Sequence, residues 1–93
     1  MLDRARAEEA IRRAFLDRRE SLENRKYYFQ PETIEESESY LVLIAISEEK
    51  DPKTGYPLSN PVFAFMKESG TVLYCTVNNW RFVLAEHISD RDS

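Results

Sequence analysis

The most reactive side chains in this sequence belong to one cysteine, Cys75, and one histidine, His87. Nucleophilic catalysis requires a thiol or a hydroxyl within hydrogen-bond reach of a base such as that imidazole. The strand register that we expect places Cys75 and His87 on opposite faces of a β-sheet, so the two side chains should not meet. We therefore predict that Cys75 is a small core residue, that His87 lies at the surface, and that the chain has no catalytic residues.

The motifs that bind cofactors and metals are also missing from the sequence. The two glycines, Gly55 and Gly70, stand 15 positions apart, whereas P-loop and dinucleotide fingerprints need closely spaced glycines. One thiolate and one imidazole are too few ligands for a structural zinc site, and residues 48–52 do not have the oxygen spacing of a calcium loop. We expect no cofactor, no metal and no enzyme activity.

Acidic side chains are concentrated in the middle of the chain. Residues 1–31 carry a net charge of +2, residues 32–51 carry −6 and residues 52–93 are balanced, which gives −4 overall. The candidate partner-binding carboxylates flank an apolar strand at both ends: Glu35, Glu36, Glu38, Glu48, Glu49 and Asp51. An acidic patch can dock a basic protein and steer its approach; alternatively, these charges only keep the apolar strand soluble. The negative net charge disfavours nucleic-acid binding.

The periodicity of apolar residues predicts a single α+β domain over residues 1–93. A helix is expected over about residues 3–24, because the following residues fall on one stripe: Ala7, Ile11, Ala14, Phe15 and Leu22. Strands are expected over about residues 27–34, 39–47, 61–67, 71–77 and 80–88, with a long loop at 47–60 and a polar tail at 89–93. The predicted fold is one N-terminal helix packed on one face of a four- to five-stranded antiparallel β-meander.

Two turns set the expected register of the last three strands. A three-residue loop at 68–70 pairs Lys67 with Thr71, and a two-residue turn at Asn78-Asn79 follows the next strand. On this register one face is covered by the helix and carries Phe63, Phe65, Leu73, Cys75, Val77, Trp80, Phe82 and Leu84. The opposite face carries three further candidate partner-binding residues: Tyr74, Arg81 and His87.

The strand from Tyr40 to Ile46 is apolar at every position, which indicates that both faces of the sheet are covered. One helix can cover only one of them. The second face also contains Val62, Met66 and Val72, and an exposed apolar patch of this kind usually marks an interface. We therefore expect the second face to be covered by a protein partner, a second copy of the chain, a ligand or the long loop.

The order of elements, with a helix, an acidic connector, an apolar strand, a turn-rich loop and a hairpin, resembles the small bacterial immunity domains that neutralise polymorphic toxins. The stretches that carry the resemblance are Leu58-Ser59-Asn60-Pro61-Val62 and Lys67-Glu68-Ser69-Gly70-Thr71-Val72. The outline is also similar to PepSY-like and cystatin-like domains. The resemblance covers roughly residues 3–76 and implies a non-enzymatic inhibitor with a cytosolic protein target, but it assigns no functional residue.

Three functions remain open from the sequence. The first is a non-enzymatic protein-binding domain of immunity or inhibitor type, which uses the acidic patch or the exposed sheet face. The second is a homodimeric domain that binds a small molecule or has a regulatory role. The third is a small enzyme with a pocket that joins His87 to Tyr74 or Arg81. The charged start of the chain and its short apolar runs predict no signal peptide and no membrane association, so a cytoplasmic location is expected.

Overall fold

The computed structural model describes residues 2–18 and 26–92, without the side chains of Leu2 and of residues 90–92. Its elements are α1 (Leu2–Ile11), the π-helical turn η1 (Arg12–Leu16), β1 (Tyr27–Phe29), β2 (Glu35–Glu36), β3 (Tyr40–Ser47), β4 (Val62–Met66), β5 (Val72–Cys75) and α3 (Trp80–Asp92). The strands form an antiparallel sheet in the order β1-β3-β4-β5. Both β1 and β2 pair with β3: β1 pairs with its C-terminal end and β2 with its N-terminal end. The predicted α+β class, with an N-terminal helix on an antiparallel sheet, is confirmed.

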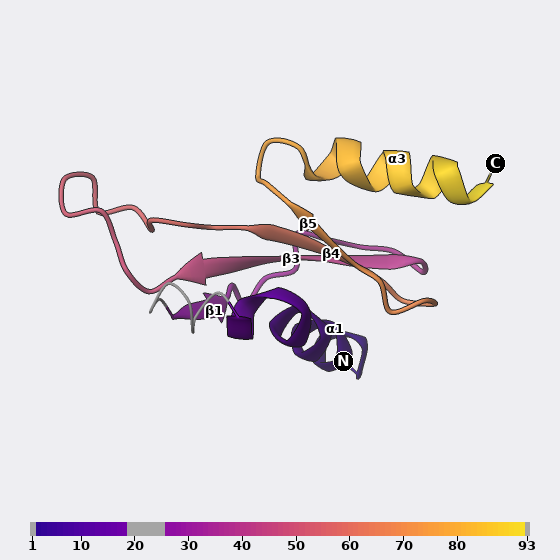
Figure 1. Ribbon diagram of the computed structural model, residues 1–93, viewed down its shortest axis with the longest axis horizontal. Coiled ribbons are helices and arrows are strands. Elements are labelled where there is room, and N and C mark those ends of the chain that lie inside the picture. The colour runs from indigo at the N-terminus through magenta and orange to yellow at the C-terminus, as the bar shows by residue number, and fades with distance from the viewer. Residues whose placement is uncertain (1, 19–25, 93) are drawn as a thin grey trace.

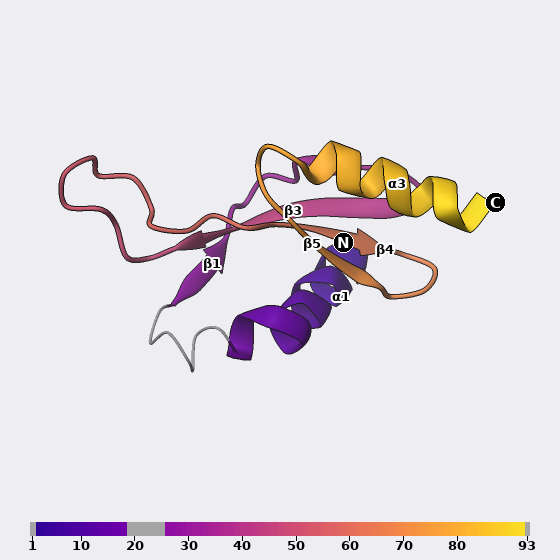
Figure 2. The same cartoon turned by 45° about the horizontal axis from the view of Figure 1, so that its top comes forward.

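The sheet lies between two helical layers (Figure 1, Figure 2). On one face, α1 and η1 cover a core that includes Ile11, Leu43 and Phe63. On the other face, α3 covers a second core that includes Val62 and Leu84. Alternate residues of β3 and β4 point to the two cores, which explains why both strands are apolar throughout. The inference that both faces are covered is right, but the covering element on the second face is α3 of the same chain.

The predicted strand at 80–88 and the predicted tail at 89–93 are wrong, because residues 80–92 form α3. Thr76 caps this helix. Its amide donates to Oδ1 of Asn79 (2.8 Å), and its Oγ1 accepts from the amide of Asn79 (3.2 Å). This reciprocal pair is a capping box, so the Asn78-Asn79 segment leads into a helix instead of closing a hairpin.

The residues of α3 that pack on the sheet follow helical spacing. Trp80, Leu84 and Ile88 belong to the second core, at intervals of four residues. Phe82, which a strand would place on the same face as Leu84, is 67% exposed. The aromatic and branched residues of this segment favour a strand by propensity, but burial of the helical stripe of Trp80, Leu84 and Ile88 on an otherwise open sheet face decides the outcome.

The turn between β4 and β5 is one residue longer than predicted. The amide of Met66 donates to the carbonyl of Thr71 (2.8 Å), so residues 67–70 form the turn. A shift of one residue exchanges the two faces of a strand. As a result, Tyr74 lies on the α1 face and Cys75 lies on the α3 face, which is the reverse of the predicted arrangement.

The N-terminal helix contains a π-helical turn that changes which residues are buried. The amide of Asp17 donates to the carbonyl of Arg12, five residues earlier, as is characteristic of a π-helix. Because the turn is wider here, Leu16 joins Ile11 in the core while Ala14 is exposed. The predicted stripe is therefore wrong at this point, and the part of the helix predicted beyond residue 18 lies outside the described residues.

The strand predicted over residues 27–34 is only partly right: Tyr27–Phe29 form β1, the chain kinks at Pro31, and β2 begins after the predicted end, at Glu35. Arg4 of α1 holds this kink with its guanidinium group. It donates to the carbonyl oxygens of Gln30 (2.6 Å) and Pro31 (2.9 Å). It also donates to Oγ1 of Thr33 (3.2 Å). These bonds connect the edge of the sheet to α1 and satisfy backbone groups that the kink removes from the ladder.

The predicted loop at 47–60 is a hydrogen-bonded arm that extends the β3–β4 hairpin. Three amide-to-carbonyl bonds join its two sides: Ser47 to Ser59 (2.9 Å), Leu58 to Glu49 (3.0 Å) and Asp51 to Tyr56 (2.8 Å). The arm projects past both helices along the longest dimension of the molecule (Figure 1), which measures 45 Å against 25 and 24 Å for the other two. This arm consists of residues 48–60.

Candidate functional site

The six candidate carboxylates form two separate groups. The first consists of Glu35, Glu36 and Glu38 at β2, and the second consists of Glu48, Glu49 and Asp51 on the arm. Glu35 lies opposite Val42 of β3, and the stretch of β3 from Val42 to Glu48 spans about 20 Å at the rise of an extended chain. The acidic segment therefore offers two distinct surfaces instead of one continuous patch.

Two carboxylates of the first group, Glu35 and Glu36, contact neighbouring side chains. The hydroxyl of Tyr40 donates to Oε2 of Glu35 (2.7 Å), and this bond raises the pKa of Tyr40. Nζ of Lys67 lies 2.9 Å from Oε2 of Glu36 and 3.6 Å from Oδ2 of Asp3. The contact with Glu36 raises the pKa of Lys67. The charge of this group is thus partly balanced within the chain.

An open groove of about 200 Å³ separates the first group from α3. Its lining residues are Glu35, Tyr40, Trp80, Arg81, Leu84, Ala85 and Ile88. The guanidinium carbon of Arg81 lies 4.9 Å from the centroid of the Trp80 ring, a cation–π distance. The structure thereby brings two of the predicted site residues, Glu35 and Arg81, to opposite sides of one groove.

The second group stands where β3 bends into the arm, at a bulge on Glu48. Ser47 is fully buried and spans the bulge: its Oγ accepts from the amide of Glu49 and donates to the carbonyl of Glu49, both at 3.1 Å. The amide of Glu48 points to β1 instead and donates to the carbonyl of Lys26 (2.9 Å). Bulges bend and twist a strand, so this local network sets the direction of the arm.

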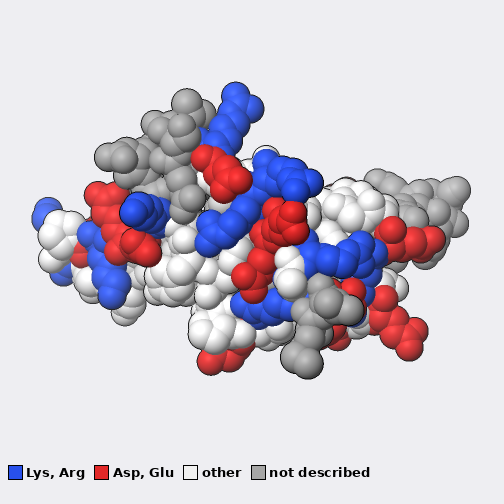
Figure 3. Space-filling view, turned by 90° about the horizontal axis from the view of Figure 1, so that it is seen from below, with Lys and Arg blue, Asp and Glu red and all other residues white. Residues whose placement is uncertain are grey.

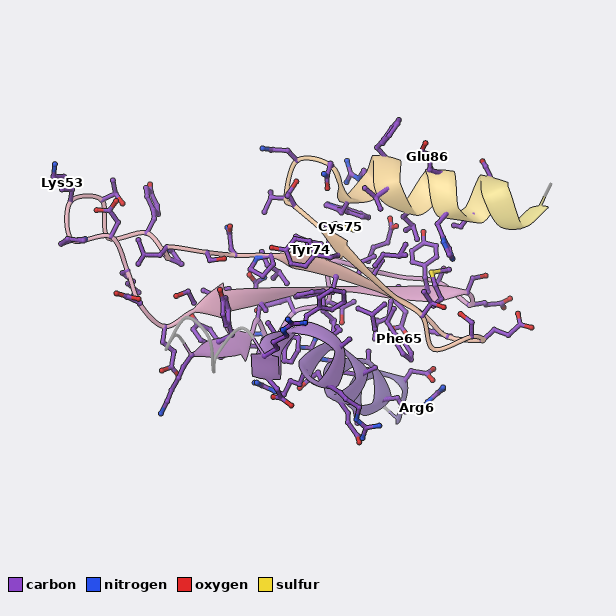
Figure 4. The ribbon with its side chains drawn as sticks, in the orientation of Figure 1. Arg6, Lys53, Phe65, Tyr74, Cys75 and Glu86 are labelled. Carbon is purple, nitrogen blue, oxygen red and sulfur yellow. The ribbon has the colours of Figure 1, made fainter. Side chains whose placement is uncertain are left out.

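The tip of the arm is closed by a compact turn. Oδ1 of Asp51 accepts from the amide of Lys53 (2.7 Å), and the carbonyl of Asp51 accepts from the amide of Gly55 (2.8 Å). Gly55 has a φ of 77°, which a residue without a Cβ adopts readily. Lys53 points outward at the end of the arm (Figure 4). The backbone of the tip is therefore satisfied by the arm itself.

Sequence reasoning missed the two large apolar residues of the arm. Tyr56 is 73% exposed, the highest value among the large apolar residues that the structure describes, and Leu58 is 44% exposed. The signal was present in the sequence, because these residues flank Pro57 within an otherwise polar segment. A loop with no core to contribute to has little structural reason to keep such side chains.

The structure does not bring Tyr74 together with Arg81 or His87. The ring of Tyr74 lies on the α1 face, with its centroid 5.6 Å from that of Phe15 and 5.5 Å from that of Phe63. Arg81 and His87 belong to α3, on the other side of the sheet. The sheet therefore separates His87 from Tyr74, so the version of the small-enzyme hypothesis that joins these two side chains loses its basis.

Cys75 and His87 both lie on the α3 side of the sheet, which corrects the predicted opposite placement. Cys75 is 1% exposed within the second core, so the prediction of a core cysteine is confirmed, and burial raises the pKa of its thiol. A buried thiol of raised pKa is a poor nucleophile. His87 is partly buried, and its Nε2 is buried with no hydrogen-bond partner among the described residues.

The outer surface of α1 carries both charges in alternation (Figure 3). Ion pairs join Arg4 to Glu8 (2.8 Å) and Arg13 to Glu9 (2.6 Å) at a spacing of four residues. Interleaved pairs of this kind stabilise a solvated helix. They leave no continuous basic stripe on the described part of this helix.

A comparison with protein-family models, curated proteins and solved structures finds no match for this chain. Within the described residues, no helix is long and apolar enough to cross a membrane. The same part of the chain contains no group of three or more histidine, cysteine, aspartate or glutamate side chains placed to hold a metal ion.

Proposed function

We propose that this chain is a non-enzymatic protein-binding domain that presents the arm to a protein partner. The observation that carries the proposal is the exposure of Tyr56 (73%) on an arm whose backbone is already hydrogen-bonded. Tyrosine is enriched among the residues that dominate binding energy at protein interfaces. Leu58, also exposed, adds a second apolar contact on the same arm.

The construction of the arm favours binding because its conformation is set before a partner arrives. The bonds across the arm, the turn at Gly55 and the bulge at Glu48 restrict its backbone. Association costs less conformational entropy when a binding segment is preorganised. A flexible loop with the same exposed tyrosine would bind more weakly.

The charges of the arm define the partner further. Glu48 and Glu49 are exposed at its base, while Lys50 and Lys53 follow toward the tip. A partner that fits has an apolar pocket for the ring of Tyr56 and basic residues at the rim near Glu48 and Glu49. Such rim charges raise the rate of encounter more than the final affinity.

The resemblance to toxin-immunity domains is compatible with this proposal. Under that resemblance the partner is a cytosolic toxin, which the arm would block. The version that uses an exposed sheet face loses its basis, because α3 covers Val62 and Met66 on that face. A homodimer made by stacking the two sheets face to face loses its basis for the same reason.

The experiment compares three forms of the tagged chain in extracts of the organism that encodes it. The forms are the native chain, the double variant Tyr56→Ser/Leu58→Ser and the control Phe82→Ser, which removes a similarly exposed aromatic ring from α3. We expect a protein that is retained by the native chain and by the control but lost from the arm variant. A retained protein that binds all three forms alike would contradict the use of the arm.

Calorimetry with the purified partner then measures the strength of the contact. We expect the arm variant to bind at least about 10-fold more weakly than the native chain, as for a hot-spot residue. The variant Glu48→Lys/Glu49→Lys should associate more slowly at low salt and approach the native rate at high salt. Equal association rates at low salt would remove the basic rim from the proposal.

A further inference from the structure

The two edges of the sheet differ in their protection against further strand pairing. At one edge, Pro31 interrupts the ladder, and β2 consists of two glutamates. At the other edge lies β5, the last strand in the order. From Thr71 to Asn79 the sequence has no charged residue and no proline. Natural edge strands are protected from pairing with another chain by shortness, a charge, a proline or a bulge; β5 is short, with four residues, and has none of the other three.

The register of β5 shows which of its backbone groups point away from the sheet. The amide of Met66 donates to the carbonyl of Thr71, so Thr71 faces β4. Backbone direction alternates along an antiparallel strand, and Leu73 therefore also faces β4. The main-chain groups of Val72 and Tyr74 point to the outer edge, where a further strand would pair.

A groove runs beside this edge on the α1 face. Its larger part, of about 430 Å³, is lined by Ala10, Arg13, Ala14, Phe15, Gly70 and Val72. A smaller part, of about 250 Å³, continues along Arg6, Glu9 and Phe65. The two alanines leave space on the helix side of the groove. A strand added to β5 would place alternate side chains between itself and α1, in the larger part of this groove.

We propose that β5 pairs antiparallel with β5 of a second copy of this chain, which joins the two sheets across a twofold axis. With Leu73 opposite Leu73 of the second copy, Val72 stands opposite Tyr74 of the second copy. Residues of such a pair exchange both of their main-chain hydrogen bonds. The pairing involves only the edge of the sheet and does not depend on the arm or on the function proposed above.

The side chains make this pairing self-complementary, which is what a twofold interface requires. Tyr74 is 41% exposed and lies on the α1 face. In the paired strands the exposed side of its ring, which packs on Phe15 and Phe63 of its own chain, faces the groove beside Val72 and Ala14 of the second copy. The ring and the groove that receives it thus belong to the same surface, which makes a second copy the occupant that fits.

The charges along the groove also suit a second copy. Arg13 and Glu9 form an exposed pair on α1 (2.6 Å). Antiparallel pairing of β5 brings the two α1 helices side by side on the same face, in opposite directions. Glu9 of each copy can then approach Arg13 of the other. Because the paired segment is short, we expect a weak dimer that forms as the protein concentration rises.

Sedimentation velocity across a range of concentrations tests the proposal with Ala14→Arg, which fills the groove from an exposed helix position. The matched control is Ala85→Arg, the same change at an exposed position of α3. We expect the native chain and the control to shift from monomer to dimer between micromolar and millimolar protein, and Ala14→Arg to stay monomeric. A native chain that stays monomeric throughout, or an Ala14→Arg variant that dimerises like the control, would overturn the proposal.

Hydrogen exchange on the native chain tests the same contact without a substitution. We expect the amides of Val72 and Tyr74 to exchange more slowly at high than at low protein concentration, while the amides of the arm are unchanged. A dimer whose formation leaves these two amides unprotected would place the interface elsewhere and overturn the proposal. This measurement also decides the matter if the groove variant fails to fold.

Discussion

The two faces of the sheet are covered by helices from opposite ends of the chain, and they differ in how they are built. On the α1 face, aromatic rings meet closely: the centroids of Phe15 and Phe63 are 5.5 Å apart. On the α3 face, the core consists of smaller strand residues, such as Val62 and Ala64, beneath Trp80. The α1 face is also fixed by Arg4 bonds, whereas the start of α3 is fixed by a local cap.

This difference shows that a strand with two apolar faces predicts two covering layers but does not say where each layer comes from. The sequence pattern of β3 required cover on both sides. An external partner and the last segment of the chain both satisfy that requirement. The cap at Thr76 starts a helix, and the spacing of Trp80, Leu84 and Ile88 packs that helix on the sheet, so the covering layer comes from the chain itself.

The largest expected effect tests the α3 face. Leu84→Ala should lower the free energy of unfolding by about 3 kcal/mol, because it leaves a cavity beside a fully packed sheet. Phe82→Ala should leave stability nearly unchanged, because that ring is 67% exposed. Urea denaturation with an unchanged m-value measures both changes. If the two variants lost similar stability, residues 80–88 would behave as the strand that the propensities suggest.

A smaller effect is expected from the polar contacts of the α1 face. Arg4→Met keeps the length of the side chain but removes its bonds to Gln30, Pro31 and Thr33. We expect a loss of about 2 kcal/mol in the free energy of unfolding, since removal of a charged donor leaves the carbonyl oxygens of Gln30 and Pro31 without this partner.

The matched control for Arg4 is Arg13→Met, which breaks an exposed ion pair with Glu9. Exposed pairs of this kind contribute little to stability, so thermal or urea unfolding should not change measurably. Equal losses in the two variants would show that Arg4 acts as an ordinary surface charge and does not hold the kink at Pro31.

The smallest effect concerns the pH dependence of the α3 face. The bond to Glu35 raises the pKa of Tyr40, so the neutral hydroxyl favours the folded state. This contribution is complete below a pH of about 10, the ordinary value for tyrosine, and is lost as the pH rises through the raised pKa. Glu35→Gln should therefore lower the pKa of Tyr40, as followed by tyrosinate absorbance.

The control for Tyr40 is Glu36→Gln, which removes the neighbouring carboxylate that contacts Lys67 instead. The tyrosinate titration of this variant should stay close to that of the native chain. If both variants shifted the titration equally, the cause would be the general negative charge of β2 and not the hydrogen bond from Tyr40 to Glu35.

Much of the fold was predictable because its signals are local or strictly periodic. The unbroken apolar runs of β3 and β4 identify two central strands within a residue or two of their ends. Two predictions failed where one residue changes the outcome. The four-residue turn before β5 reversed the faces of Tyr74 and Cys75. The π-helical turn put Leu16 in place of Ala14.

The candidate site was less predictable than the fold because surfaces depend on the spatial arrangement of segments. Glu35 and Glu48 belong to one acidic stretch of sequence, yet an extended strand separates them. Arg81 meets the groove of Glu35 and Tyr40 only because α3 folds back over the sheet. The sequence places Tyr56 next to Pro57 in a polar segment, but the exposure of its ring follows from the hydrogen-bonded arm that this segment forms.

The sequence by itself determined the α+β class, the N-terminal helix, the central strands and the need to cover both faces of the sheet, because binary patterns and turn residues act over short distances. Only the tertiary structure decided that residues 80–92 form a helix, that β5 pairs with β4 so that Tyr74 lies opposite Phe63, and that the arm projects from the body. These outcomes depend on which distant apolar surfaces meet. The arrangement that buries the most apolar surface over the whole chain is the stable one, and a short window of sequence does not show which distant surfaces can pack together.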